Sequence, residues 1–254
     1  MEEFNAKKEV QNIIKFVQDY YATNNLGGAV IGISGGKDSG VVAGLMCKAL
    51  GPENVLGVWM PCYSKEQDKE DAKKVADRFG FKLIDFDITP AFEAFKLSDS
   101  LLGNYGENVT QNSDINLKPR LRMSTLYYLA AKYSQIYGKT YIVAGTSNKS
   151  ELYVNYFTKG GDSVHDIALI ADYFVDEVIK IGEYIDVPHS VLYKTPDDGL
   201  SGKSDEEKLG VTYAKIKAHM LVEDLEDKKD ALLIERLHAS GSHKFNIPTY
   251  RRSE

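Results

Sequence analysis

Cysteine is scarce in this sequence, with two residues, Cys47 and Cys62, among 254. They do not form a Cys-x-x-Cys pair, and two thiols are too few for the disulfide framework of a small secreted domain. Cys47 lies in an apolar helical segment and Cys62 follows a predicted strand, so both are interpreted as structural residues. This cysteine usage indicates a reducing compartment.

Long apolar runs and an excess of basic residues are also missing. No apolar run approaches the roughly 18 residues that a membrane span requires. The N-terminal stretch MEEFNAKKEVQNII lacks the apolar centre of a signal peptide. The formal net charge of -6 argues against a sequence-independent grip on DNA or RNA, which needs a basic face. We therefore expect a cytoplasmic protein without membrane or nucleic-acid partners.

Predicted strands and helices alternate along the first 145 residues. Helices are expected at 3–21, 38–50, 65–79, 90–97 and 117–137, and strands at 29–33, 55–60, 81–86 and 141–144. This order predicts an α/β fold, a doubly wound parallel sheet with helices on both faces. Loops are expected at 98–116, 158–166 and 195–204, and the chain from about 167 is otherwise predicted to be helical. Without an internal repeat or a composition break, residues 1–254 are interpreted as one domain.

The segment SGGKDS, residues 34–39, lies between a predicted strand and a predicted helix. A Walker A loop reads G-x-x-x-x-G-K-[ST]. Alignment on Gly36-Lys37 places Ile31 at the first glycine and Asp38 at the hydroxyl residue. Both requirements fail, so this is not a loop of that type.

The same hexapeptide is well suited to hold a polyphosphate. Its two glycines permit close backbone approach, and the amides of the following helix favour an anion. Ser34 and Ser39 offer hydroxyl donors, and Asp38 can bind Mg²⁺ through oxygen. The alternative is a glycine-rich turn capped by Asp38. The segment resembles the PP-loop of the ATP pyrophosphatases, which cleave ATP between the α and β phosphates.

Further segments, in order along nearly the whole chain, resemble the ammonia-dependent NAD⁺ synthetases. They are NLKPRLRM at 116–123, GTSNKSELYVNYFTKGGD at 145–162, TPDDGLSGKSDEEKLGVTY at 195–213, and the pair His243-Lys244. The resemblance implies a Rossmann-like fold and a homodimer. It also implies a ligase that uses ATP and Mg²⁺ to amidate deamido-NAD⁺ with ammonia. The products would be NAD⁺, AMP and pyrophosphate, formed through an adenylated carboxylate.

The resemblance also implies the roles of individual residues. The residues that it implies for ATP binding are Gly32, Ile33, Ser34, Gly35, Gly36, Lys37, Asp38, Ser39 and Thr146. Deamido-NAD⁺ binding falls to Arg120, Lys159, Asp166, His243 and Lys244. The metal ligands would be Asp38 and Glu151, and the catalytic residues Asp38 and Lys159.

Several of these residues have a structural alternative. The competing interpretations are a surface position for Arg120, a helix cap for Glu151 with Asn148 or Ser150 as the N-cap, a solvated loop pair for Lys159 and Asp166, and an ordinary tail for His243 and Lys244. Asp205-Glu206 is interpreted as a carboxylate pair that favours the start of a helix.

The chain departs from the family pattern beside the expected ATP phosphates. Val175 stands where the family has a phosphate-binding lysine, Leu169 replaces a proline, and Asp197 replaces a serine or threonine. Lys37 occupies a position that is usually uncharged in the family. We hypothesise that Lys37 restores the charge lost at Val175.

These departures leave two further functions open. One is a PP-loop ligase for a different carboxylate, and the other is a non-catalytic nucleotide-binding relative. Because neither cysteine lies in a nucleophile context, no glutaminase is expected, and free ammonia should support turnover.

Overall fold

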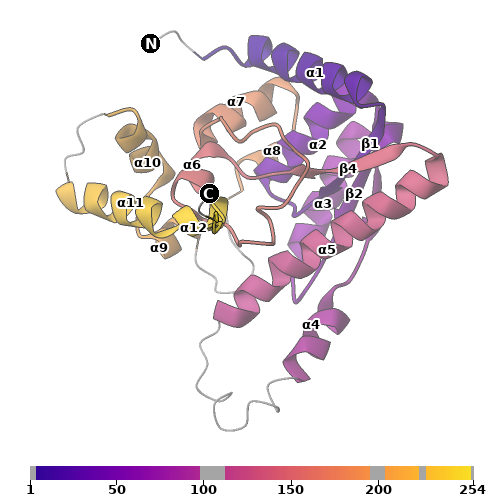
Figure 1. The fold of residues 1–254 in the computed structure, drawn as a ribbon. Coiled ribbons are helices and arrows are strands. Elements are labelled where there is room, and N and C mark those ends of the chain that lie inside the picture. Colours follow the sequence, from indigo (N-terminus) through magenta and orange to yellow (C-terminus); the bar gives the residue numbers. More distant parts are fainter. Residues whose placement is uncertain (1–3, 98–111, 195–203, 223–226, 253–254) are drawn as a thin grey trace.

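The computed structural model describes residues 4–97, 112–194, 204–222 and 227–252 (Figure 1). One sheet contains β1 (Leu26–Gly32), β2 (Val55–Trp59), β3 (Lys82–Asp85), β4 (Thr140–Gly145) and β5 (Ile167–Ala168). Its order is β3-β2-β1-β4-β5 and every pairing is parallel. The predicted α/β fold is confirmed. The order reverses between β1 and β4, which is where sheets of this kind bind ligands beyond the carboxyl ends of the strands.

Two layers of helices cover the sheet. The side chains of α1 (Ala6–Thr23), α2 (Lys37–Leu50), α3 (Glu66–Phe79), α7 (Val175–Tyr184) and α8 (His189–Leu192) share one apolar core with the sheet. The opposite core contains α4 (Thr89–Lys96) and α5 (Asn112–Tyr137). Because side chains alternate along a strand, Ile31 of β1 enters the first core and Val30 enters the second.

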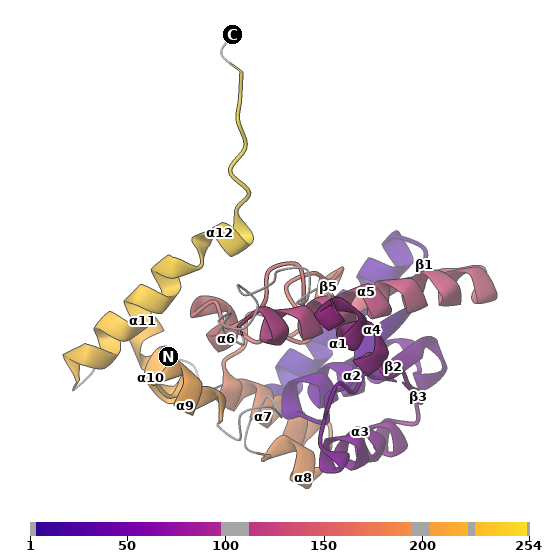
Figure 2. The ribbon, with the colours of Figure 1, turned by 90° about the horizontal axis from the view of Figure 1, so that it is seen from below.

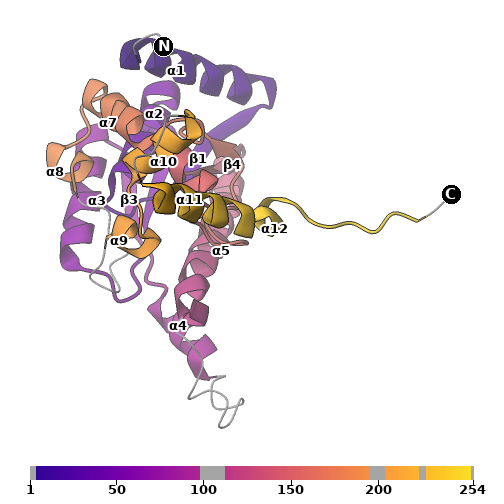
Figure 3. The ribbon, with the colours of Figure 1, turned by 90° about the vertical axis from the view of Figure 1, so that its left-hand side faces the viewer.

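A smaller group of helices lies at one end of the sheet. It comprises α6 (Lys149–Tyr153), α9 (Asp205–Leu209), α10 (Tyr213–Met220), α11 (Lys228–Ser240) and α12 (Ser242–Phe245). An apolar cluster that includes Val154, Leu209, Ile216 and Ile234 holds this group together. After α12 the chain extends away from the body of the molecule (Figures 2 and 3).

Two elements differ from the sequence expectation. Helix α5 begins at Asn112 rather than 117, and Pro119 lies inside it. The prediction assigned residues up to 116 to a loop because the stretch is rich in Gly, Asn, Ser and Asp, and it therefore started the helix too late. Strand β5 was missed because two residues carry no periodic signal. Of the loops expected at 98–116 and 195–204, residues 98–111 and 195–203 lie outside the described residues. Among the described residues, no helix has the length and hydropathy that a membrane crossing needs.

Candidate active site

The SGGKDS segment closes on itself where it leads from β1 into the first turn of α2, which begins at Lys37. The Oγ atoms of Ser34 and Ser39 lie 3.1 Å apart, the amide of Gly36 donates to Ser34 Oγ, and Ser39 Oγ donates to the Gly36 carbonyl. Gly35 has a φ of 80°, and a Cβ there would lie 2.4 Å from the carbonyl oxygen of Asp68. Only glycine therefore fits this position.

The first turn of α2 carries no side-chain cap. Its N-cap is Gly36, and no side chain bonds to the exposed amides of the turn, so Asp38 does not cap this helix. Those amides can bind an anion, together with the positive end of the helix dipole. The local geometry therefore favours a phosphate site over the alternative of a capped turn.

A cavity of about 610 Å³ opens beside this loop, at the carboxyl ends of β1, β2 and β4. The residues predicted for ATP and metal that line it are Gly32, Ile33, Ser34, Gly36, Lys37, Asp38, Ser39, Thr146 and Glu151. Among the residues predicted to bind deamido-NAD⁺, Lys244 lines it, whereas Arg120, Lys159, Asp166 and His243 do not. The residues predicted to bind ATP and metal are thus brought together at the cavity, whereas most residues predicted to bind deamido-NAD⁺ lie outside it.

The two carboxylates predicted to bind a metal share one neighbour, Asn148. Its Nδ2 donates to Asp38 Oδ1 at 3.3 Å, and its backbone N donates to Glu151 Oε2 at 3.1 Å. The Glu151 amide donates in return to Asn148 Oδ1, which completes a capping box at the start of α6. Glu151 therefore caps a helix and also faces the cavity, and the two interpretations of this residue are compatible.

Glu151 is a poorly solvated carboxylate. Burial, reinforced by the negative charge of Asp38, raises the pKa of Glu151 to about 8. In the described part of the chain, no group of three or more Asp, Glu, His or Cys residues gathers as a complete metal centre. A cation held by Asp38 and Glu151 would need its other oxygen ligands from phosphates or water, as Mg²⁺ in nucleotide sites does.

Lys37 lies inside this acidic group. Its side chain is 5% exposed, and its Nζ lies 3.0 Å from Asp38 Oδ2. Burial acts to lower the pKa of Lys37, but Asp38, Glu151 and Asp205 together raise it above its usual value. Asp205, interpreted from sequence as a helix-start residue, also lines the cavity at the first position of α9.

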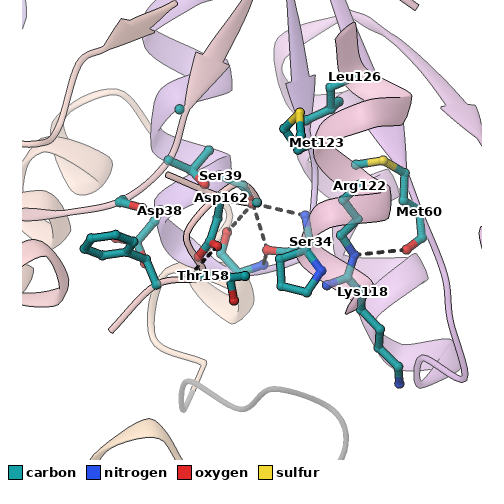
Figure 4. Close-up of a pocket in the computed structure, with 18 of the residues that line it drawn as sticks. Ser34, Asp38, Ser39, Met60, Lys118, Arg122, Met123, Leu126, Thr158 and Asp162 are labelled. Carbon is teal, nitrogen blue, oxygen red and sulfur yellow. Dashed lines mark hydrogen bonds between the residues drawn. The ribbon is translucent and has the colours of Figure 1, made fainter. Parts of the chain in front are cut away.

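Helix α5 forms the opposite wall of the cavity. Lys118, Arg122, Met123 and Leu126 line it at helical spacing (Figure 4). Arg122 Nε donates to the Met60 carbonyl at 3.4 Å. Burial lowers the pKa of the Arg122 guanidinium. Arg122 forms no ion pair with a carboxylate of the described residues, since none lies within 4.0 Å of its guanidinium nitrogens.

Lys118 and Arg122 were missed by the sequence analysis, although both lie in NLKPRLRM. Lys118 is buried, and its Nζ donates to the Cys62 carbonyl. The i, i+4 spacing of these two cations was the available signal. Arg120 lies on another side of α5, where it is exposed and donates from Nε to the Lys159 carbonyl.

The loop before β5 meets the C-terminal helices. Lys159 Nζ donates to the His243 carbonyl at 2.6 Å. Lys244 Nζ donates to the carbonyls of Asn155 and Phe157, and burial lowers its pKa. The basic pair at 243–244 therefore docks against the loop at 155–159.

Asp166 bonds to strand β4 and helix α5. It accepts hydrogen bonds from Tyr127 Oη at 3.0 Å and from the backbone N of Val143 at 2.8 Å. Since Lys159 bonds elsewhere, Lys159 and Asp166 do not form the solvated pair considered from sequence.

The position of the missing lysine lies away from the cavity. Val175 is the first residue of α7, and its side chain packs against the C-terminal apolar cluster. Asp197 lies outside the described residues. A different lysine, Lys194, lines the cavity, and its Nζ bonds Asp68 at 2.6 Å and Asp71 at 2.8 Å.

Comparisons with known proteins agree on one family. A family profile described as NAD synthase matches residues 9–247. A protein of Methanococcus aeolicus named NH(3)-dependent NAD(+) synthetase is 40% identical over 231 residues, which is 89% of this chain and 87% of the relative. A Carboxydothermus hydrogenoformans protein of the same name is 35% identical over 96% of this chain and 97% of its own.

Two solved structures are similar over nearly their whole length. The NMN synthetase of Francisella tularensis has a TM-score of 0.87 and 31% identity, over 99% of this chain and 100% of that one. The NH3-dependent NAD synthetase of Campylobacter jejuni has a TM-score of 0.77 and 26% identity, over 98% and 100%.

Proposed function

The chain belongs to the NAD synthase family, and from this premise we propose how its cavity performs the family reaction. The reaction is the ATP-dependent amidation of deamido-NAD⁺ by ammonia, and the enzyme is an AMP-forming carbon–nitrogen ligase. The residue assignments rest on one observation. The segment at 34–39 lines the same cavity as Asp38 and Glu151, the two carboxylates that bond Asn148.

The loop holds the phosphates of ATP. The uncapped amides of α2 and the hydroxyls of Ser34 and Ser39 donate to phosphate oxygens, where they stabilise charge as pyrophosphate leaves. Gly32, Ile33, Gly35 and Gly36 let the backbone approach, and Thr146, after β4, contacts the same nucleotide. The substrate carboxylate attacks the α-phosphate, and ammonia then displaces AMP from the adenylated carbonyl.

Asp38 and Glu151 would hold Mg²⁺, because both are oxygen donors that line the same cavity and Glu151 is half-buried beside the negative charge of Asp38. When bound, the metal supplies charge neutralisation at the phosphates. Asn148 orients both carboxylates through its two hydrogen bonds. Asp38 is thus assigned a catalytic role.

The remaining cations serve the anionic substrates. Arg122 and Lys118 reach the cavity from α5 and bind phosphate or carboxylate groups there. Lys159, assigned a catalytic role next to deamido-NAD⁺, is held by the backbone of His243. Lys244 lines the cavity as well, whereas Arg120, Asp166 and His243 do not, and their place in the deamido-NAD⁺ site rests on the family resemblance alone.

The enzyme works as a homodimer in the cytoplasm. Exposed aromatic and aliphatic side chains on α1 and α5 support an interface there: Phe16, Tyr20, Tyr128, Ile136 and Tyr137. Residues 1–254 act as one unit, because the cavity is lined by the loop at 34–39 and also by Asp205 and Lys244 of the C-terminal helices.

A second candidate substrate follows from the Francisella structure. That protein is named NMN synthetase, and its TM-score of 0.87 exceeds the 0.77 of the Campylobacter NAD synthetase. The same chemistry applied to nicotinate mononucleotide gives NMN. Comparison of kcat/KM for the mononucleotide and for deamido-NAD⁺ decides between them, and we expect deamido-NAD⁺ to be preferred because the curated relatives carry that name.

The test of function is direct. Purified protein with ATP, Mg²⁺, ammonium and deamido-NAD⁺ should yield NAD⁺ and AMP in equal amounts. Glutamine alone should support no turnover, and Asp38→Asn should abolish it. ATP bound without AMP release would indicate a non-catalytic relative, and AMP formed only with another carboxylate would indicate an altered ligase.

A further inference from the structure

The acidic group at the cavity contains its own cation. Lys37 is almost fully buried, and its ammonium lies against Asp38, the residue assigned to the divalent metal. A buried lysine in such surroundings stays charged because its neighbours offset the loss of solvent.

Both oxygens of Asp38 are already engaged. Lys37 Nζ bonds Oδ2 at 3.0 Å, and Asn148 Nδ2 bonds Oδ1 at 3.3 Å. The amide of Asn148 is neutral, so it can orient a carboxylate that also binds a metal. The ammonium of Lys37, in contrast, repels any divalent cation that approaches the same oxygen.

Tyr213 begins α10 and carries a second buried polar group. Its hydroxyl is buried and has no hydrogen-bond partner in the described structure. Burial, followed by the charges of Glu151, Asp205 and Asp38, raises the pKa of Tyr213.

We propose that Lys37 is a resident counter-cation that competes with the divalent metal for Asp38 and moves to the ATP phosphates when metal and nucleotide arrive together. This rests on the proposed assignment of Asp38 and Glu151 as metal ligands. Lys37 also lines the cavity, and its ammonium bonds Asp38, which lines the same cavity. The exchange makes binding of free metal weak and couples metal binding to ATP binding.

This role differs from simple replacement of the lysine missing at Val175. Val175 packs in the C-terminal apolar cluster and does not line the cavity. The positive charge of Lys37 is directed at the metal ligand, so its main effect should be on metal affinity in the absence of nucleotide.

The test measures Mn²⁺ binding to the full-length protein without nucleotide. The electron paramagnetic resonance signal of free Mn²⁺ reports how much of the metal is unbound. Lys37→Met, which keeps the length and removes the charge, should bind Mn²⁺ about 10-fold more tightly than the wild type, equivalent to one unfavourable contact of about 1.4 kcal/mol. Lys37→Arg keeps the charge and should resemble the wild type. Equal or weaker Mn²⁺ binding by Lys37→Met would overturn the proposal.

The matched control is Lys194→Met. Lys194 is also a cavity lysine paired with carboxylates, but its partners are Asp68 and Asp71. Its removal should leave Mn²⁺ affinity within about twofold of the wild type. A 10-fold gain in this variant as well would show that only the general charge of the cavity matters, and would also overturn the proposal.

Nucleotide affinity tests the second half of the exchange. Lys37→Met should bind ATP with Mn²⁺ less tightly than the wild type, although it binds free Mn²⁺ more tightly. Unchanged ATP affinity would refute the movement of Lys37 to the phosphates. Thermal unfolding shows whether the Lys37→Met protein is folded. If Mn²⁺ raises the Tm of this variant more than it raises the Tm of the wild type, the variant binds Mn²⁺ more tightly, which supports the competition independently.

Failure of the underlying assignment gives a different result. Asp38→Asn and Glu151→Gln should both lose Mn²⁺ binding. If they bind Mn²⁺ as the wild type does, the metal site lies elsewhere and the proposed function loses its metal ligands. If they lose Mn²⁺ while Lys37→Met is unchanged, only the competition proposed for Lys37 is wrong.

Discussion

The side-chain amide of Asn148 donates a hydrogen bond to Asp38 across 110 positions of sequence. Asp38 follows β1 and Asn148 follows β4, and these strands are neighbours at the point where the sheet order reverses. Asn148 is fully buried and also pairs with Glu151. One residue thus bonds both carboxylates assigned to the metal: its side-chain amide donates to Asp38 and its backbone N donates to Glu151.

Replacement of Asn148 should therefore cost both stability and activity. Asn148→Ala removes an N-cap, which lowers the free energy of unfolding by about 1 kcal/mol. It also removes the side-chain hydrogen bond to Asp38, so kcat/KM for ATP should fall about 10- to 100-fold, as for residues that orient metal ligands. Urea unfolding and steady-state kinetics measure the two effects.

The control for this prediction is Asn5→Ala. Asn5 caps α1, and its side chain accepts from the Lys8 amide, remote from the cavity lining. The Asn5→Ala variant should lose about as much free energy of unfolding as Asn148→Ala and should keep the kcat/KM of the wild type. Full activity in folded Asn148→Ala protein would refute the positioning role.

Arg122 should matter for substrate binding because its guanidinium faces the cavity without a carboxylate among the described residues as partner. Arg122→Met removes one charge-assisted contact of about 1.5–3 kcal/mol, so kcat/KM should fall about 10- to 100-fold. Arg236→Met, an exposed substitution on α11, serves as the matched control and should be neutral. If both variants match the wild type in kinetics, Arg122 is a structural residue only.

Asp71 should contribute stability that depends on pH. Burial acts to raise its pKa, but its bonds with Lys194, Lys74 and Gln67 prevail and hold the pKa below the usual 3.8. A depressed folded-state pKa stabilises the fold at pH values above 3.8, and this stability is lost as pH falls through the folded-state value. Asp71→Asn should lower the free energy of unfolding by about 1–3 kcal/mol at neutral pH, with a smaller difference near pH 3.

The comparison for Asp71 is Asp186→Asn. Asp186 is paired with Arg78, but its side chain is 73% exposed, and such surface pairs contribute little. Denaturant titrations at pH 7 and pH 3 should show a pH-dependent loss for the Asp71 variant alone. An equal loss at both pH values would mean that shape, rather than charge, explains its effect.

The proposed dimer makes α5 an interface. Tyr128 is 55% exposed on this helix, and Tyr128→Glu would place a charge in an apolar contact. The mass measured by light scattering should fall from that of a dimer to that of a monomer. Leu232→Glu, on the exposed face of α11, should remain dimeric. A dimeric Tyr128→Glu protein would place the interface elsewhere.

The sequence could predict those parts of the site whose chemistry is local. The SGGKDS loop and its flanking strand and helix are adjacent in the chain, so residues 32–39 could be assigned directly. Asn148 was noticed only as a possible cap, because its contact with Asp38 depends on which strands are neighbours. Asp205 was read as a helix-start residue for the same reason, since only the fold brings α9 to the cavity.

The two arginines of NLKPRLRM show most clearly what the sequence could not predict about the site. Two residues apart in a helix point about 200° apart, so Arg120 and Arg122 cannot both face one cavity of the same chain. Which of them faces it depends on how α5 packs on the sheet, and the periodicity of the helix alone does not reveal this. The departure at Val175 likewise needed the fold, which places this residue in an apolar cluster.

The most direct test follows the oxygen of the substrate carboxylate. Deamido-NAD⁺ labelled with ¹⁸O in its nicotinate carboxylate is incubated with ATP, Mg²⁺, ammonium and the enzyme, and the products are analysed by mass spectrometry. Because the carboxylate attacks the α-phosphate and ammonia then displaces AMP, one ¹⁸O should appear in AMP and none in pyrophosphate. Formation of ADP, or ¹⁸O in a product other than AMP and NAD⁺, would contradict the proposed mechanism.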